Sequence, residues 1–228
     1  MYIETTEKLL DFIEKSPTAF QAVDEMQKRL TENGFEVLSE KEYWKLVPGG
    51  KYLVTRNNSA LIAFCIPEKE SRVFHIMASH SDSPSFKIKE NPEIKVDNSY
   101  VKLNVEKYGG MLMAPWFDRP LSVAGRVIIR RNDGLEEKLV DMVMIPNLAI
   151  HMNREANNGV AYNLQKDLQP LFAAGNTDRT LLEIIAEQTG VKKEDIISHD
   201  LFLYNRMPGT IWGADKEFVS SARLDDLQ

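Results

Sequence analysis

His80 and Asp82 are the residues whose types and spacing come nearest to a metal site in this sequence. They follow an apolar run within residues 72–86, R-V-F-H-I-M-A-S-H-S-D-S-P-S-F. Alternate residues of an extended chain point to the same side, so the two side chains can share a face. An imidazole that binds a metal through one nitrogen usually donates its other N–H to a carboxylate or carbonyl. The pair therefore predicts either a ligand with its orienting group or two unrelated surface residues.

A second group of candidate ligands lies near residue 225, in the sequence R-L-D-D of residues 223–226. Asp225 can supply an oxygen ligand to a cation such as Zn²⁺, or it can form a surface ion-pair cluster with Arg223. Catalytic zinc commonly takes three protein ligands plus water, and His80 with Asp225 gives only two. The motifs H-E-x-x-H, C-x-x-C, G-x-S-x-G and G-x-x-x-x-G-K are absent. The residues alone thus predict half of a metal site.

The three other histidines have different surroundings. His75 lies within the apolar run, which predicts a core histidine, and His199 lies in a polar segment, which predicts a surface position. His151 lies where a strand gives way to a loop and is followed by Asn153 and Arg154. That setting suits binding of an anion or carboxylate, and the alternative is an ordinary surface histidine.

The elements that must position His80 and Asp82 are helices followed by strands. Residues 73–78 read as a buried strand that ends at these two residues. Before it, apolar spacing predicts a short helix around residues 9–13 and a second helix capped by Ser16 and stopped by Asn33-Gly34. Two strands joined by Asn57-Asn58-Ser59 form a predicted hairpin. This order favours an α/β sheet.

The pattern changes after Pro84 to an alternation of apolar and polar residues. Alternation of this kind is typical of antiparallel strands with one wet face. Asn132-Asp133-Gly134 is a strong hairpin signal. We expect strands at residues 86–96, 100–105, 121–130, 137–145 and 201–204, and a helix at residues 179–188 that is capped by Asn176 or Thr177.

Composition describes an ordinary globular protein of 228 residues, with 43% hydrophobic and 27% charged residues. The net charge of −6 argues against a nucleic-acid partner. The single cysteine, Cys65, lies in an apolar run, so we expect a buried, inert thiol. No signal peptide or membrane-spanning run is present in the sequence, which predicts a cytoplasmic protein without a membrane partner. The chain ends on Leu227-Gln228 directly after two carboxylates, and we interpret this either as a truncated chain or as a chain whose missing part a partner supplies.

Four blocks occur in order along the chain: A-S-H-S-D-S-P (residues 78–84), Y-G-G-M-L-M-A-P-W-F-D-R-P-L-S-V-A-G (108–125), P-N-L-A-I-H-M-N-R (146–154) and S-A-R-L-D-D-L (221–227). Together they resemble the aspartyl aminopeptidase family, the M18 metallopeptidases. The resemblance covers essentially the whole chain.

The resemblance implies an α/β proteolytic domain interrupted by a β-rich dimerisation domain. Residues 1–88 and 206–228 would form the proteolytic domain, and residues 89–205 the insert. By motif, His80 resembles a zinc ligand, Asp82 the catalytic carboxylate that orients it, and Asp225 the carboxylate that bridges two zinc ions. His151 resembles a histidine that reaches from one subunit into the active site of its neighbour and meets substrate there.

The activity implied is removal of N-terminal residues from peptides, acidic residues by the family name, through water activated by two zinc ions. Members of the family form homo-oligomers, dimers or higher, up to dodecamers. They are longer than this chain, and the additional part carries a pair of glutamates, an aspartate and a histidine. We therefore expect this chain alone to bind zinc weakly or not at all and to be inactive. The alternative is a non-catalytic assembly module built on the β-rich insert.

Overall fold

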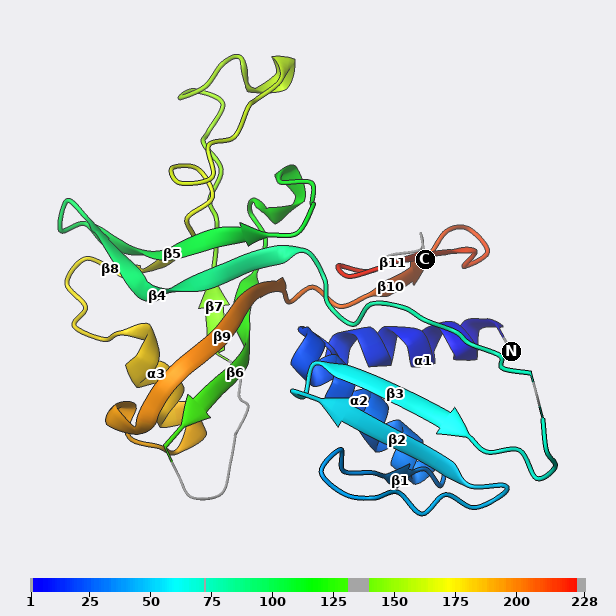
Figure 1. Cartoon of the computed structure of the whole chain (residues 1–228). Helices are drawn as coiled ribbons and strands as arrows, with labels where there is room; N and C mark the ends of the chain where they lie inside the picture. Colours follow the sequence, from blue (N-terminus) through cyan, green and yellow to red (C-terminus); the bar gives the residue numbers. More distant parts are fainter. Residues whose placement is uncertain (1, 72, 131–139, 225–228) are drawn as a thin grey trace. The chain divides into compact units, whose positions relative to one another are not determined.

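The computed structural model (Figure 1) describes residues 2–71, 73–130 and 140–224. It divides into two compact units: Met1–Ser83 with Pro208–Gln228, and Pro84–Met207. Residues 85–88, which the family resemblance placed in the proteolytic domain, pair with a strand of the second unit. Arg206 likewise donates its backbone N–H to the carbonyl of Pro120 in the second unit (3.0 Å).

The first unit contains two helices, a three-stranded sheet and a hairpin. Its elements are α1 (Tyr2–Lys15), α2 (Ala19–Glu32), β1 (Glu36–Val37), β2 (Lys51–Arg56), β3 (Ala60–Cys65), β10 (Thr210–Trp212) and β11 (Phe218–Ser220). In the sheet, β2 lies between β1, to which it is parallel, and β3, to which it is antiparallel. Phe20 and Val23 of α2 are buried, as are Tyr52 and Leu53 of β2, and these side chains form the core of the unit.

Local sequence explains the ends of these elements. Asn57 and Asn58 have φ values of 54° and 50°, and residues in this left-handed region form the tight turn that was predicted between β2 and β3. The predicted stop of α2 is confirmed, with Asn33 at the C-cap and Gly34 at φ 84°. The predicted start is wrong by two residues, because the N-cap is Thr18 and not Ser16.

The buried strand predicted at residues 73–78 is absent. This segment belongs to no strand of the described chain, and its apolar side chains face solvent, with Ile76 84% and Met77 99% exposed. His75, the predicted core histidine, is exposed with them. A strand exists only where a neighbour takes up its backbone hydrogen bonds, and β3, an edge of the small sheet, pairs only with β2 in the part of the chain described.

Cys65 is also exposed, which corrects the prediction of a buried thiol. It ends β3, where the burial pattern leaves most side chains open to solvent. The apolar sequence of β3 predicts burial, but β3 is an edge strand of the small sheet and its side chains are exposed or half-buried.

The second unit is a six-stranded antiparallel sheet in the order β7-β6-β9-β4-β5-β8 with one helix beside it. The elements are β4 (Ser85–Val96), β5 (Tyr100–Tyr108), η1 (Ala114–Trp116), β6 (Leu121–Ile129), β7 (Val140–Val143), η2 (Ala156–Asn158), β8 (Leu171–Ala174), α3 (Leu181–Thr189), η3 (Lys193–Asp195) and β9 (Ile196–Asn205). The predicted hairpin turn at Asn132-Asp133-Gly134 lies outside the described residues, although β6 and β7 do pair as antiparallel neighbours.

The sheet curls so that its two edges meet. Met144, next to β7, exchanges two backbone hydrogen bonds with Leu171 of β8, of 3.3 and 2.7 Å. Closure of this kind removes free strand edges. The inner face forms one apolar core that includes Phe86, Leu103 and Leu201.

Helix α3 adds Leu181 and Ile185 to this core, and its cap differs from the prediction. Thr180, and not Asn176 or Thr177, is the N-cap, and it forms a capping box with Glu183. The backbone N–H of Thr180 donates to Glu183 Oε2 (2.8 Å), and the N–H of Glu183 donates to Thr180 Oγ1 (3.3 Å). Gly190 ends the helix at φ 68°, as its position after the apolar stripe predicted.

Candidate metal centre

His80 and Asp82 lie together, as their spacing predicted. Nδ1 of His80 is 3.2 Å from Oδ1 of Asp82 and 2.9 Å from the backbone carbonyl oxygen of the same residue. Both side chains are a little under half exposed, at 46% and 45%. With Nδ1 facing an acceptor pair, Nε2 is the ring nitrogen that would bind a metal.

The backbone that brings them together is a loop and not the strand end that was expected. Residues 73–84 have no regular secondary structure. Between the two candidates, Ser81 donates its hydroxyl to the carbonyl of Ser59 at the β2–β3 turn (2.8 Å). This hydrogen bond ties the loop to the first unit, so His80 and Asp82 are held beside a defined element.

Asp225, the second predicted ligand, lies outside the described residues. The chain leading to it is described as far as residue 224. Arg223 donates a hydrogen bond from Nη2 to the carbonyl of Ile13 in the last turn of α1 (2.6 Å). A cation at a helix C-terminus is favourable because it meets unpaired carbonyls and the negative end of the helix dipole. Arg223 therefore anchors this end of the chain to the first unit, the unit that also holds His80.

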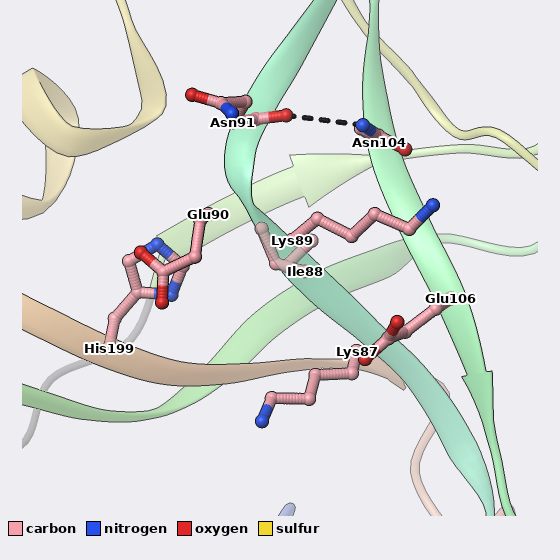
Figure 2. Close-up of a pocket in the computed structure, with 8 residues that line it drawn as sticks. All are labelled: Lys87, Ile88, Lys89, Glu90, Asn91, Asn104, Glu106 and His199. Atoms are coloured by element: carbon pink, nitrogen blue, oxygen red, sulfur yellow. Dashed lines mark hydrogen bonds between the residues drawn. The ribbon is translucent and has the colours of Figure 1, made fainter.

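Of the three other histidines, His75 and His151 are exposed and His199 is buried, beside the pocket drawn in Figure 2. His151 is exposed, in a turn of the second unit. His199 was predicted to lie at the surface and is buried in β9 instead. Sequence reasoning missed the alternation of His199 with Leu201 and Leu203, both buried, which is the period-two signal of one strand face.

The described residues do not complete a zinc site. Among residues 2–71, 73–130 and 140–224, no group of three or more His, Cys, Asp or Glu side chains is arranged to hold a metal ion. A histidine oriented by a carboxylate fits one zinc position, since zinc prefers nitrogen, sulfur and carboxylate oxygen ligands. The structure thus contains one oriented ligand of a metal site and not the whole coordination shell.

Comparison with known proteins identifies the family and fold of the chain that contains His80. Residues 12–228 match the family model described as "Aminopeptidase I zinc metalloprotease (M18)". The chain belongs to the M18 aminopeptidase family. The fold is accordingly the α/β fold of that family, and it includes a curled antiparallel sheet.

Individual M18 proteins match the chain from end to end. A "Probable M18 family aminopeptidase 2" of Clostridium acetobutylicum is 46% identical over 99% of this chain and 55% of its own length. A structure of Chaetomium thermophilum mApe1 is 31% identical with a TM-score of 0.82, covering 95% of this chain and 54% of the other. A structure of the S. cerevisiae mApe1 dodecamer is 26% identical with a TM-score of 0.75, covering 96% and 52%.

The chain spans about half the length of the M18 relatives that it matches. Within the described residues, no helix is long and apolar enough to cross a membrane.

Proposed function

We propose that this chain is the N-terminal part of a zinc aminopeptidase that removes N-terminal residues from peptides. The observation that carries the proposal is the contact between His80 and Asp82 in a chain of the M18 family. In many zinc sites, the histidine that binds the metal through one ring nitrogen donates its other N–H to a carboxylate, and Nδ1 of His80 faces such a carboxylate. The preference for acidic N-terminal residues and the cytoplasmic location stay predictions.

His80 would bind one zinc ion through Nε2, and Asp82 would fix the orientation of the ring. Asp225, which lies outside the described residues, would supply a carboxylate shared by two zinc ions. When bound, zinc polarises the scissile carbonyl and lowers the pKa of a coordinated water. Asp82 therefore acts by positioning His80, and its removal should weaken metal binding before it affects any other step.

We further propose that the protein works as a homo-oligomer, with the β-rich second unit as its dimerisation domain. One solved relative is named as a dodecamer, which supports assembly of similar chains. His151 would bind substrate in the active site of a neighbouring subunit. Its exposure in a turn of the second unit is compatible with a role outside its own chain.

The chain is proposed to be inactive without additional polypeptide. Three observations support this: the described residues hold no three-ligand group, the relatives are about twice as long, and an apolar segment, residues 73–78, faces solvent. Exposed apolar runs of this kind mark surfaces that another segment covers. A strand from the additional part could pair with residues 73–78 and bring in the missing ligands.

The test is an aminopeptidase assay with fluorogenic aminoacyl substrates, with and without added Zn²⁺ or Co²⁺. We expect no turnover by this chain alone and metal-dependent turnover when the C-terminal part of the C. acetobutylicum relative is joined to it. His80→Ala should abolish the restored activity. Lys69→Ala, which alters an exposed side chain outside residues 73–78, is the control and should retain it.

Robust turnover by the 228-residue chain alone would overturn the proposed incompleteness. Equal loss of activity in the Lys69 and His80 variants would overturn the role of His80. The alternative, a non-catalytic assembly module, has no observation of its own in its favour, because the matched relatives are named as aminopeptidases.

A further inference from the structure

The chain contains two Asn-Gly dipeptides, Asn33-Gly34 and Asn158-Gly159. Asparagine before glycine is prone to spontaneous deamidation, because glycine has no side chain to hinder the approach of its nitrogen to the asparagine side chain. Both asparagines are exposed, so water and hydroxide reach both. The fold holds the two dipeptides differently, and this difference decides which of them can react.

Asn33-Gly34 is held in an unreactive arrangement at the C-terminal end of α2, where Asn33 is the C-cap. The side chain of Asn33 donates from Nδ2 to the carbonyl of Arg29 (2.8 Å), which keeps the amide turned back along the helix. The backbone N–H of Gly34, whose nitrogen would be the nucleophile, donates to the carbonyl of Thr31 (3.0 Å). Reaction at Asn33 therefore requires that the end of the helix open first.

Asn158-Gly159 lies in the loop between β7 and β8, and the fold does not restrain its nucleophile in this way. Asn158 is the last residue of η2, and Gly159 follows it with φ 115°. In the part of the chain that the structure describes, the N–H of Gly159 donates to no other backbone group. Among the same residues, a Cβ placed on Gly159 would meet no atom within 4 Å beyond its chain neighbours. The space in which the Asn158 side chain can approach this nitrogen is therefore open.

The Asn158 side chain itself is held by a weak contact. Its Nδ2 donates to Oε2 of Glu155, three residues earlier in the chain. Both side chains are exposed, and a surface hydrogen bond contributes little net free energy because water competes for the same groups. The amide can thus leave Glu155 and turn toward Gly159 without any element of the fold having to open.

We propose that Asn158 is a site of spontaneous deamidation that the fold leaves accessible while it protects Asn33. Hydroxide removes the proton from the Gly159 nitrogen, and this nitrogen attacks Cγ of Asn158. The new C–N bond closes a cyclic succinimide, the bond from Cγ to Nδ2 breaks, and the departing nitrogen takes up a proton from water and leaves as ammonia. A second water then opens the ring at either carbonyl, which gives aspartate or isoaspartate. The reaction needs no oxidant, metal or enzyme, so it is independent of zinc and of peptidase activity.

Deamidation replaces an attraction between residues 155 and 158 by a repulsion. The amide that donates to Glu155 becomes a carboxylate, which only accepts hydrogen bonds. Like charges three residues apart on a helical turn destabilise that turn. The modification therefore opens η2 (Ala156–Asn158), which follows His151 by a few residues in the same loop.

The experiment incubates the folded chain at mildly alkaline pH and follows both dipeptides by peptide mapping with tandem mass spectrometry. Trypsin releases them in separate peptides, residues 30–41 and 155–166. We expect the mass gain of deamidation to appear at Asn158 at least about tenfold faster than at Asn33, because hydrogen bonds at the helix end must open before Asn33 can react. In the chain unfolded by guanidinium chloride, the two rates should agree within about twofold, since the fold no longer protects Asn33.

Asn158→Gln is the matched variant, because glutamine keeps the amide on a longer side chain that closes such a ring far more slowly. It should abolish the mass gain in the peptide of residues 155–166 and leave the rate at Asn33 unchanged. The position is exposed, so the variant will fold.

Equal rates at Asn33 and Asn158 in the folded chain would overturn the proposal, as would a ratio of rates that unfolding leaves unchanged. Absence of deamidation at Asn158 in the folded chain, while the unfolded chain reacts, would overturn it too. A mass gain that persists in Asn158→Gln would place the reaction at Asn157 or Asn163 of the same peptide and would also contradict it.

Discussion

Truncation of Ile76 to alanine should leave the stability of this chain almost unchanged. About a sixth of the Ile76 surface is buried, because 84% of it is exposed. Full burial of an isoleucine side chain contributes about 1.5–3 kcal/mol, so a sixth of this is about 0.3–0.5 kcal/mol. Sequence alone predicts the opposite, because a strand core would lose about 2–5 kcal/mol on the same change.

The matched control is Leu53→Ala in β2 of the same unit. Leu53 has the same number of side-chain carbons and is 0% exposed, so its truncation should cost about 3 kcal/mol. Urea unfolding followed by far-UV circular dichroism gives both values on one scale, since the two residues report on the same unit.

A loss of more than about 2 kcal/mol in Ile76→Ala would refute the reasoning, because it would place this side chain in a packed interior in solution. The account also predicts a larger effect of the same substitution when the C-terminal part of a relative is present. Ile76→Ala should then weaken association of the two parts, since residues 73–78 are proposed to be covered by it.

Three further predictions concern the second unit. Asp200→Asn should lower the free energy of unfolding by about 2 kcal/mol in urea, because the largely buried Arg126 loses its charged partner. Glu194→Gln, the control, should change the free energy of unfolding by less than about 0.5 kcal/mol. Equal effects of the two variants would contradict the ion-pair account. Acidification from pH 7 to 5 should lower the melting temperature less in His199→Phe than in the unaltered chain. Burial lowers the pKa of His199 from its ordinary value of 6.5, so on acidification the imidazole is protonated in the unfolded chain before it is protonated in the folded chain. The stability that the neutral ring contributes above pH 6.5 is therefore lost as the pH falls through the folded pKa. Identical profiles of melting temperature against pH in the two proteins would count against this. Thr180→Ala should cost about 1 kcal/mol through loss of the capping box, and a neutral result in thermal unfolding would show that α3 is held by packing alone.

Local signals in the sequence predicted most of the strands of the second unit and the turn of the β2–β3 hairpin. Asn57-Asn58 specified the turn because asparagine tolerates a left-handed backbone. Alternation of apolar residues located β4, β5 and β6, since their partners lie within the chain. Cap residues were misplaced by a few positions, because several Ser, Thr and Asn residues near each helix start can serve.

The sequence predicted that His80 and Asp82 lie together, but it did not predict that they lie in a loop. The spacing of His80 and Asp82 brought their side chains together even without a strand, since two residues of separation are close in a loop as well. Burial of residues 73–78 could not be judged from the residues alone, because it depends on a neighbouring strand that the described chain does not supply. His199 was misjudged for a related reason, since its polar flanks concealed the alternation that placed it in β9.

The most direct test of the account is the location of zinc in a crystal of this chain joined to the C-terminal part of the C. acetobutylicum relative, found by anomalous scattering at the zinc edge. We predict zinc at about 2.0–2.2 Å from both His80 Nε2 and a carboxylate oxygen of Asp225. Zinc bound elsewhere, or His80 and Asp225 on opposite sides of the first unit, would contradict it.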